Sequence, residues 1–357
     1  MDEILFIKEY YHYLIVFICL ITFITFFSDV KKGQHLAKAY NIIIYCFSIF
    51  TVFYLGNREI NIGFDTFRYE HTFGIYENSP SFFIRKDPFF DFLTYVFSKT
   101  LGFNALLIFC AFIYVFGALY GLKLIFKSNY FLPFLVFLIF PYFMNMGINV
   151  IRSGVAASLF LIGIGKYYNI RNFKQALLWV AFSIMFHFSM IIPLSVFFLT
   201  RFIKNTKAIF LIWICSIILA VLNINVIANF ISIIEGFTSR VGDYAEVGGG
   251  ESSWINFIIF GFFPVVFAVY FIVIKKFNDK FYTWIVNSYM ITHVPYIILI
   301  NTQFASRIGY LAEFMMPIIL MYPLLNEETR KFPFFKFKLC LLLFLVFLIK
   351  GYKVLVV

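Results

Sequence analysis

The chain has 357 residues, of which 62% are hydrophobic and only 13% are charged, and its formal net charge is +11. Soluble domains carry about 25% charged residues, so this composition excludes an ordinary soluble domain and indicates a membrane protein. In a membrane protein, basic cytoplasmic loops account for an excess of positive charge. We therefore expect no nucleic-acid partner.

The cysteines argue against a metal or disulfide scaffold. All five lie in apolar stretches, and their spacing matches neither a zinc site nor a disulfide framework. No cluster of His, Cys, Asp and Glu suggests a tightly held metal ion, so we expect neither a metal nor a cofactor. The first apolar stretch follows Asp2 and Glu3 and lacks a small-residue cleavage site, so we expect it to remain as a span rather than leave as a signal peptide.

Long apolar stretches define the predicted fold class. A transmembrane helix needs about 20 apolar residues, and no internal repeat or linker divides the chain. We predict an all-α polytopic membrane protein of one domain, residues 1–357, with about ten transmembrane helices. The predicted spans are 11–28, 40–56, 104–126, 130–146, 150–168, 208–233, 254–274, 281–300, 307–325 and 335–352.

The basic loops predict the orientation of these spans, because Lys and Arg concentrate on the cytoplasmic side. Loops at 31–38, 123–127, 166–174, 201–207, 275–280 and 330–338 are rich in lysine. Placing them inside puts both termini outside, together with loops 57–103, 234–253 and 301–306 and a short turn at 145–150. We expect 57–103 to form an outer flap and 234–253 to form a mobile outer loop.

Residues 174–200 do not fit a simple alternation of spans. They lie between two basic loops that are both predicted to be cytoplasmic, and 27 residues are too few for two full crossings. One solution is a re-entrant helical hairpin with His187 near its apex and Pro193 aiding the break; non-helical backbone at this depth requires a buried or hydrated cavity. The alternative is one tilted span that departs from the charge rule.

The arginines are distributed differently from the lysines. Six of the nine arginines fall on the predicted outer side, where orientation does not require them: Arg58, Arg68, Arg85, Arg152, Arg240 and Arg307. The planar guanidinium matches the oxygens of a phosphate, so this distribution indicates an anionic ligand. For Arg58 and Arg85 we favour pairing with acidic groups in solvated loops. Arg152 and Arg307 open apolar spans, where an ionisable residue indicates function.

Other polar residues allow a structural and a functional interpretation. Asp65 lies two residues after Gly63, which permits a turn. The Asp65 side chain is interpreted either as a cap of the helix that follows or as a functional carboxylate, which lies near the acceptor hydroxyl of a sugar or positions Arg68. His187 is either a hydrogen-bonded core residue or a catalyst. Tyr69 and Tyr310, with Phe73, Tyr76 and Trp254, are either sugar-stacking surfaces or members of an interfacial aromatic belt. Glu313 is placed to approach Arg307 as a buried ion pair, and the glycine-rich segment around Arg240 and Asp243 is expected to be a lid.

Four motifs together resemble a known family. They are a Gly-Phe-Asp-Thr-x-x-Tyr loop after the second span (Gly63, Phe64, Asp65, Thr66, Tyr69, then Phe73), an Arg-x-Gly-x-Ala helix start (Arg152, Gly154, Ala156), a Phe-His-x-Ser turn (Phe186, His187, Ser189) and an Arg-x-x-Tyr span start (Arg307, Tyr310). Their order and placement over about residues 40–325 resemble the EpsG-like polysaccharide polymerases, which belong with the Wzy-type O-antigen and capsule polymerases.

The resemblance implies an inner-membrane glycosyltransferase of the GT-C-like kind, acting at the periplasmic or outer face without a metal. Such an enzyme polymerises undecaprenyl-diphosphate-linked oligosaccharide repeats into O-antigen, capsule or exopolysaccharide; its partners are these lipid-linked sugars, membrane lipids and a chain-length regulator. The catalytic candidates are Asp65, Arg152, His187 and Arg307. The substrate-binding candidates are Arg68, Tyr69, Arg240, Asp243 and Tyr310. The alternatives are an O-antigen ligase-type transferase and a transporter of lipid-linked sugars.

Overall fold

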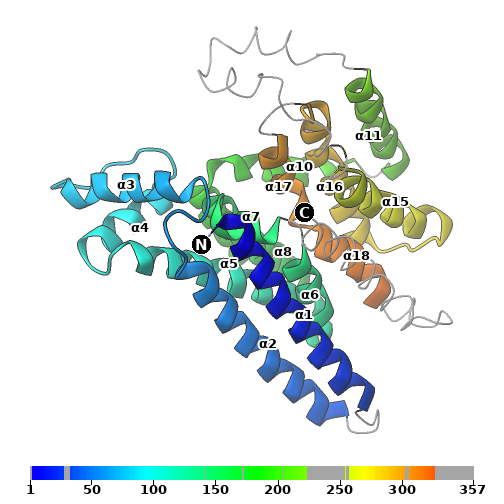
Figure 1. Ribbon diagram of the computed structural model, residues 1–357. Coiled ribbons are helices and arrows are strands. Elements are labelled where there is room, and N and C mark those ends of the chain that lie inside the picture. The colour runs from blue at the N-terminus through cyan, green and yellow to red at the C-terminus, as the bar shows by residue number, and fades with distance from the viewer. Residues whose placement is uncertain are drawn as a thin grey trace, which may run out of the picture. The chain divides into compact units, whose positions relative to one another are not determined.

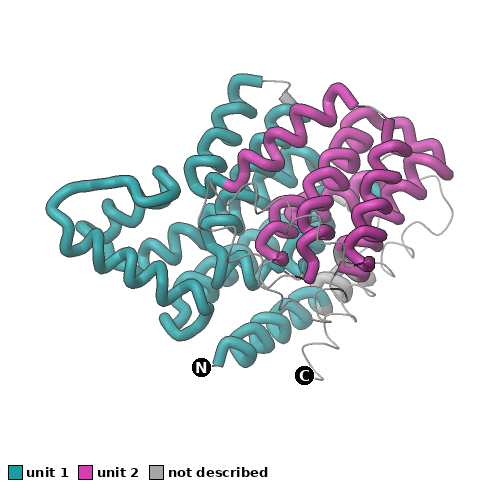
Figure 2. The backbone as a smooth tube through the Cα atoms, turned by 90° about the horizontal axis from the view of Figure 1, so that it is seen from above, with its two compact units in different colours: residues 1–188, 324–357 teal, residues 189–323 magenta. Residues whose placement is uncertain are grey.

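The described part of the protein is helical. The computed structural model describes residues 2–27, 33–140, 142–170, 173–203, 205–222, 254, 257–301 and 305–325, and these ranges contain helices but no strand. The backbone divides into two compact units, Met1–Phe188 with Leu324–Val357, and Ser189–Pro323 (Figure 2). We call them unit 1 and unit 2 and describe each by itself.

Unit 1 is built around helix α5. Its helices are α1 (Glu3–Phe27), α2 (Gly33–Gly56), α3 (Thr66–Asn78), α4 (Pro88–Lys99), α5 (Phe103–Phe126), α6 (Phe131–Ile139), α7 (Phe143–Ile148), α8 (Ile151–Ile170) and α9 (Phe173–Phe186), with a short 3₁₀ turn at Lys127–Asn129. Helix α5 packs against α2, α4, α6 and α8, and α8 packs against α9. The two antiparallel neighbours α8 and α9 therefore place Phe186 toward the end of α8 that begins at Ile151.

Small residues let α5 and α8 approach closely. A Cβ added at Gly121 on α5 would lie 2.8 Å from the backbone carbon of Leu161 on α8, and one added at Gly165 on α8 would lie 2.7 Å from Leu124. In a membrane environment, where apolar surfaces gain little by leaving lipid, such close backbone packing is a main source of helix association. The hydroxyl of Ser158 on α8 also donates to the Tyr114 carbonyl at 2.6 Å.

Unit 2 is built around helix α16. Its helices are α10 (Ile191–Thr200), α11 (Thr206–Val221), α15 (Phe263–Val269), α16 (Lys280–Ile298), α17 (Ala305–Glu313) and α18 (Met316–Leu325), which extends two residues past the unit boundary. Helix α15 continues a π-helical stretch at Phe257–Phe262 and passes into another at Tyr270–Ile274. Helix α16 packs against α10, α11, α15 and α17.

Most predicted spans correspond to helices, but the count of about ten spans stays a prediction. Within the described residues, two stretches are long and apolar enough to cross a bilayer by length and composition, Phe103–Asn129 and Ala305–Leu325, and five further apolar helices have 10–17 residues. The predicted span 335–352 and the end of 208–233 lie outside the described residues. The prediction that residues 1–357 form a single domain also stays a prediction.

The expectation of one helix over 130–146 is wrong. The chain forms α6 up to Ile139 and α7 from Phe143, because Phe140 leaves the helical conformation with ψ at 136°. Apolar composition alone did not distinguish one long helix from two short ones. The six-residue helix α7 then places its carbonyls next to the start of α8.

The predicted break at His187 is confirmed. Helix α9 ends at Phe186, a 3₁₀ turn follows at Phe188–Met190, and α10 begins at Ile191. Helix α9 packs on α8 in unit 1, whereas α10 packs on α16 in unit 2. Whether the two arms form a hairpin or one bent span stays a prediction.

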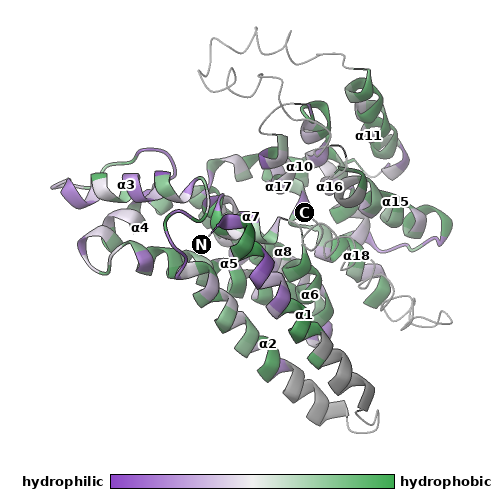
Figure 3. Ribbon diagram, viewed as in Figure 1, coloured by the Kyte–Doolittle hydropathy of each residue, from purple (hydrophilic) through white to green (hydrophobic). Residues whose placement is uncertain are grey.

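The charged stretch after α2 is itself helical. Helices α3 and α4 pack against each other and extend to one side of α1 and α2 (Figure 1). Hydrophilic residues concentrate on α3 and its flanking segments, whereas α2 and α5 are mainly hydrophobic (Figure 3). The predicted turn at Gly63 is confirmed, since its φ of +94° is in the region that favours glycine.

Polar contacts define one end of unit 1, which we call the loop end. The Arg58 guanidinium donates to the Ile148 carbonyl at 3.0 Å, and the Asn149 amide donates to the Glu3 carboxylate at 3.0 Å. The end of α2, the start of α1 and the start of α8 therefore meet there. Lys123 contacts the Tyr45 hydroxyl at 3.4 Å near the opposite end of α5. The separation of outer loops from lysine-rich loops over the whole chain and the orientation in the membrane both stay predictions.

Arg58 corrects a prediction. We expected it to pair with acidic groups in a solvated loop, but it is only 4% exposed. It donates to the carbonyls of Leu55 and Ile148 and to the Thr66 hydroxyl, and burial lowers its pKa to about 10. Arg58 therefore joins α2, α3 and α7, and its role is structural.

The close approach of α7 and α8 predicts a specific sensitivity. A Cβ at Gly154 would lie 2.5 Å from the Met146 carbonyl oxygen, a backbone atom that cannot rotate away. We expect Gly154→Ala to destabilise the protein by about 1–3 kcal/mol, as overpacking does, measured by thermal unfolding in detergent. Gly74→Ala is the matched control, because nothing lies within 4 Å of its added Cβ; a drop of similar size in this variant would contradict the packing argument.

Candidate functional site

A buried carboxylate, Asp87, is the centre of the polar site in unit 1. It directly precedes α4, whose first residue is Pro88, and proline is favoured at this position because a helix start has no use for its missing N–H. The Asp87 side chain is fully buried. A carboxylate in this position requires compensating donors.

Two hydrogen-bond donors and one histidine ring from distant parts of the chain reach Asp87. Nη1 of Arg152 donates to Oδ2, and the backbone N–H of Phe188 donates to Oδ1 at 3.1 Å. Nδ1 of His187 lies 3.7 Å from Oδ2, an ion-pair distance rather than a direct hydrogen bond. The start of α4, the start of α8 and the break after α9 therefore converge on one carboxylate.

Aromatic rings hold the Arg152 guanidinium. Its Cζ lies 5.6 Å from the Tyr69 ring centroid and 5.7 Å from that of Phe90, and these two rings meet edge to face at 5.6 Å. Arginine stacks favourably on aromatic faces. Arg152 Nε is buried and has no hydrogen-bond partner among the described residues.

The two basic groups remain accessible while the carboxylate does not. The side chains of Arg152 and His187 are 22% and 18% exposed, and that of Asp87 is 0% exposed. Burial raises the pKa of Asp87, but His187, the positive charge of Arg152 and the Phe188 N–H outweigh burial, and the net pKa is below its usual value. Asp87 is therefore ionised, and it holds the Arg152 and His187 side chains, which are both partly exposed to solvent.

Asp91 fixes the segment that leads to Asp87. One of its carboxylate oxygens accepts the backbone N–H groups of Arg85 at 2.8 Å and Lys86 at 2.7 Å. Asp91 is 3% exposed, one turn into α4. It fastens the incoming chain to the start of α4, which restrains the position of Asp87.

The structure places the predicted residues of unit 1 in two groups. Tyr69, Arg152 and His187 belong to the Asp87 site. Asp65 instead contacts Arg68 at 3.5 Å, and the Arg68 side chain is 65% exposed and lies over the Phe64 ring. Asp65 occupies the N-cap position of α3 but makes no side-chain cap, so the capping interpretation is wrong. An ion pair in which one partner is this exposed adds little stability.

Arg307 and Tyr310 lie on α17 in unit 2. Arg307 is partly exposed, and Tyr310 is 2% exposed, so its ring is not an open stacking surface. The predicted approach of Glu313 to Arg307 is replaced by another contact: Glu313 Oε1 lies 3.5 Å from Nε2 of His293, and both side chains are buried. Trp213 donates to the other nitrogen of His293 at 3.4 Å.

The remaining predicted binding residues, Arg240 and Asp243, lie outside the described residues, as does the whole loop 234–253. Among the described residues, no group of three His, Cys, Asp or Glu side chains could hold a metal ion. The absence of a metal and of a cofactor stays a prediction.

Sequence reasoning missed Asp87 as the partner of Arg152 and His187. The loop offers several carboxylates of similar appearance, and the contacts span 65 and 101 residues of sequence. The only local signal is the Asp-Pro pair at a helix start. That signal indicates an N-terminal cap rather than a site, and Asp87 makes no side-chain cap in α4.

Comparison with known proteins decides the family. The model of the EpsG family matches residues 41–356, which is nearly the whole chain and includes all four motifs named above. The chain belongs to the EpsG family. Neither a curated protein nor a solved structure matches it.

Membership of the EpsG family confirms the resemblance drawn from the motifs. Together with the apolar helices, it identifies a membrane protein of polysaccharide biosynthesis. In this EpsG-family protein, the motif residues Tyr69, Arg152 and His187 are the ones that converge on Asp87. The site therefore combines a guanidinium and an imidazole on one buried carboxylate.

The charge on Asp87 predicts a pH-dependent contribution to stability. Because its folded pKa is lowered, this contribution is present above the pKa of an unfolded aspartate, about 3.9, and is lost as the pH falls through the folded value. We expect Asp87→Asn to destabilise the protein by about 1–3 kcal/mol near neutral pH, less than for a fully buried pair because Arg152 is partly exposed. It should also weaken the loss of stability on acidification, measured as unfolding temperature against pH. Glu77→Gln, at an exposed position of α3, should keep the wild-type profile; a parallel change in both variants would contradict the prediction.

Proposed function

We propose that this EpsG-family protein is a membrane glycosyltransferase that polymerises undecaprenyl-diphosphate-linked oligosaccharide repeats into O-antigen, capsule or exopolysaccharide. It would act at the outer, periplasmic face of a bacterial inner membrane. The observation that carries this proposal is the pair of accessible basic groups, Arg152 and His187, on one buried carboxylate at the loop end of unit 1. The family match supports it.

Arg152 is suited to the leaving group. In the proposed reaction, the acceptor hydroxyl oxygen forms a bond to the anomeric carbon of the donor, and the bond from that carbon to the diphosphate oxygen breaks. The electron pair stays on the diphosphate, so negative charge develops there. A preorganised guanidinium at this point stabilises the transition state, and loss of one such donor costs about 10²–10³ in rate.

His187 is suited to accept the proton of the acceptor hydroxyl. Its Nδ1 faces the Asp87 carboxylate, which favours the tautomer with the proton on Nδ1 and leaves Nε2 as the acceptor. A carboxylate that orients a histidine in this way also stabilises the imidazolium that forms. General base catalysis typically contributes about 10²–10⁴ in rate.

The shared oxygen of Asp87 couples the two roles. Oδ2 contacts both Arg152 and His187, so Arg152 neutralises part of the charge that would otherwise stabilise a protonated His187. When Arg152 turns toward a bound diphosphate, more of the carboxylate charge becomes available to His187. Binding of the donor would thereby strengthen the base.

Other candidates keep their predicted roles within this proposal. Asp65 is an alternative base, and Arg68 is a substrate-binding residue. Arg307, which lies in unit 2, is proposed as a cation for a diphosphate without a place in the Asp87 site. Tyr69, which is 7% exposed beneath Arg152, positions the guanidinium rather than stacking on a sugar. The ligase-type reaction uses the same chemistry on a different acceptor, whereas a transporter requires no transfer.

The proposal predicts the effect of removing either basic group. Arg152→Ala and His187→Ala should each reduce chain extension by about a hundredfold or more, because they remove charge stabilisation and proton transfer. The measurement is the polymer ladder formed by purified protein in liposomes without an ion gradient, supplied with lipid-linked repeats from a strain that lacks the protein. Full-length polymer from both variants would refute these roles.

Two exposed residues of the same loop serve as matched controls. Arg85→Ala and His71→Ala remove the same side-chain types from exposed positions and should leave extension unchanged.

Transfer only to a lipid A core acceptor would favour the ligase alternative. Gradient-dependent movement of lipid-linked sugar without extension would favour transport.

A further inference from the structure

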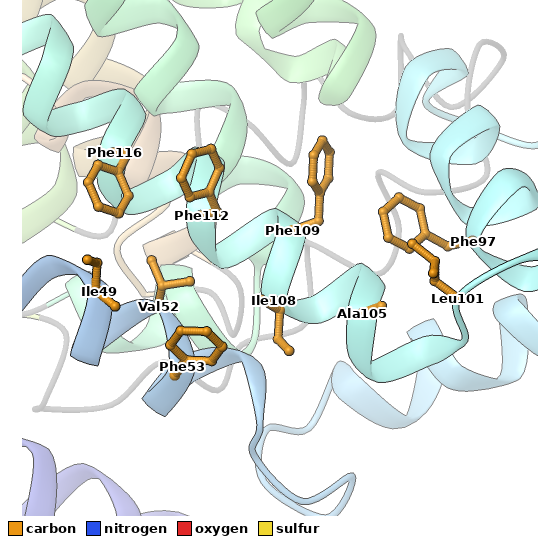
Figure 4. Close-up of a pocket in the computed structure, with 10 residues that line it drawn as sticks. All are labelled: Ile49, Val52, Phe53, Phe97, Leu101, Ala105, Ile108, Phe109, Phe112 and Phe116. Atoms are coloured by element: carbon orange, nitrogen blue, oxygen red, sulfur yellow. The ribbon is translucent and has the colours of Figure 1, made fainter.

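An apolar groove lies on the surface of unit 1. It has a volume of about 520 Å³, and its lining comes from α2, the end of α4, Leu101 in the turn after α4, and α5 as far as Phe116 (Figure 4). All lining residues are apolar, and five of them are phenylalanines. The side chains of Phe53 and Phe112 are 51% and 49% exposed, so the groove is open on one side.

The groove lies toward the loop end of the unit. Its α2 residues, such as Ile49 and Phe53, belong to the last two turns of that helix, and its first α5 residue is Ala105. Between these helices, an added Cβ at Gly56 would lie 2.6 Å from Ile108. This close contact brings α2 and α5 together just beyond Phe53.

Helix α4 connects the groove with the polar site. It begins directly after Asp87, and Phe97, near its end, lines the groove. Its 12 residues correspond to about 18 Å of helix. Phe89 and Phe97 lie near one face of α4 because they are about two turns apart. The ring centroid of Phe89 lies 5.1 Å from that of Phe186 on α9, and the ring centroid of Phe97 lies 5.4 Å from that of Phe109 on α5.

We propose that this groove binds the isoprenoid tail of the lipid diphosphate donor, an inference that rests on the proposed function. An amphiphile with an anionic head and a long apolar tail matches a cationic site and an apolar groove joined by one helix. The tail would otherwise lie in equally apolar lipid, so burial from water is not the driving force. The groove therefore acts by shape: its aromatic walls hold isoprene units beyond the second, and they thereby orient the diphosphate toward Arg152.

Tail length gives a readout that does not depend on overall activity. Ile49→Trp and Ala105→Trp place a large ring in the groove at positions that are not fully buried. With a long-tailed donor, each variant should raise KM by about tenfold, a free-energy change of 1.4 kcal/mol, with kcat little changed. With a donor that carries only two isoprene units, both variants should match the wild type, which also shows that they are folded.

Ile42→Trp is the matched control, because Ile42 lies on α2 outside the groove and is 64% exposed; it should behave as wild type with both donors. Unchanged KM of both groove variants for the long-tailed donor would overturn the proposal while leaving the proposed function intact. Failure of the wild type to extend any donor would instead count against the function.

Photo-cross-linking separates the isoprenoid from ordinary lipid. A polyprenyl diphosphate with a diazirine in its fourth isoprene unit should label peptides from residues 49–53 or 97–116, and unlabelled polyprenyl diphosphate should reduce the labelling. A phospholipid that carries a diazirine is the comparison probe. If this phospholipid labels the groove and excess polyprenyl diphosphate does not reduce that labelling, the groove binds bulk lipid and the proposal is overturned.

Discussion

The buried charge of Asp87 is the constraint on which the site depends. Removing a carboxylate from water costs several kcal/mol unless donors replace the lost hydration. Here the donors come from Arg152, His187 and the backbone of Phe188, which lie on elements far apart in sequence. The helical loop between α2 and α5 therefore cannot leave the bundle without exposing this charge or leaving its partners unsatisfied. The same interaction that fastens the loop also presents a guanidinium and an imidazole to a ligand.

Helix packing restrains the groups that contact Asp87. Helix α8 carries Arg152 in its first turn, and its small residues permit close approach to α5 and α7. Arg58 adds hydrogen bonds between α2, α3 and the end of α7 at the same end of the unit. A charged group that must direct a reaction needs such restraint, because preorganisation rather than charge alone lowers a reaction barrier. The rigid helix starts supply it.

Helix α4 gives the site a direction. Its first turn is fixed by Asp91, which binds the backbone ahead of it, and its last turn borders the apolar groove. A single short helix thus borders both a charged site and an apolar groove, and the proposed lipid-linked substrate has two parts of the same kinds. In the pair Asp65–Arg68 on the preceding segment, the Arg68 side chain is exposed and the Asp65 side chain is largely buried.

The sequence by itself determined the all-helical class, the turn at Gly63 and the family, and it offered the break at His187 as one of two alternatives, because hydropathy, backbone restriction and motif order are local properties. Only the tertiary structure selected Asp87 among the carboxylates of the loop, buried Arg58, divided 130–146 into two helices and paired His293 with Glu313. These outcomes depend on which helix ends meet in space. Side chains in loops have no periodicity that reveals their partners, and the desolvation that makes Asp87 demand donors exists only once the helices have packed.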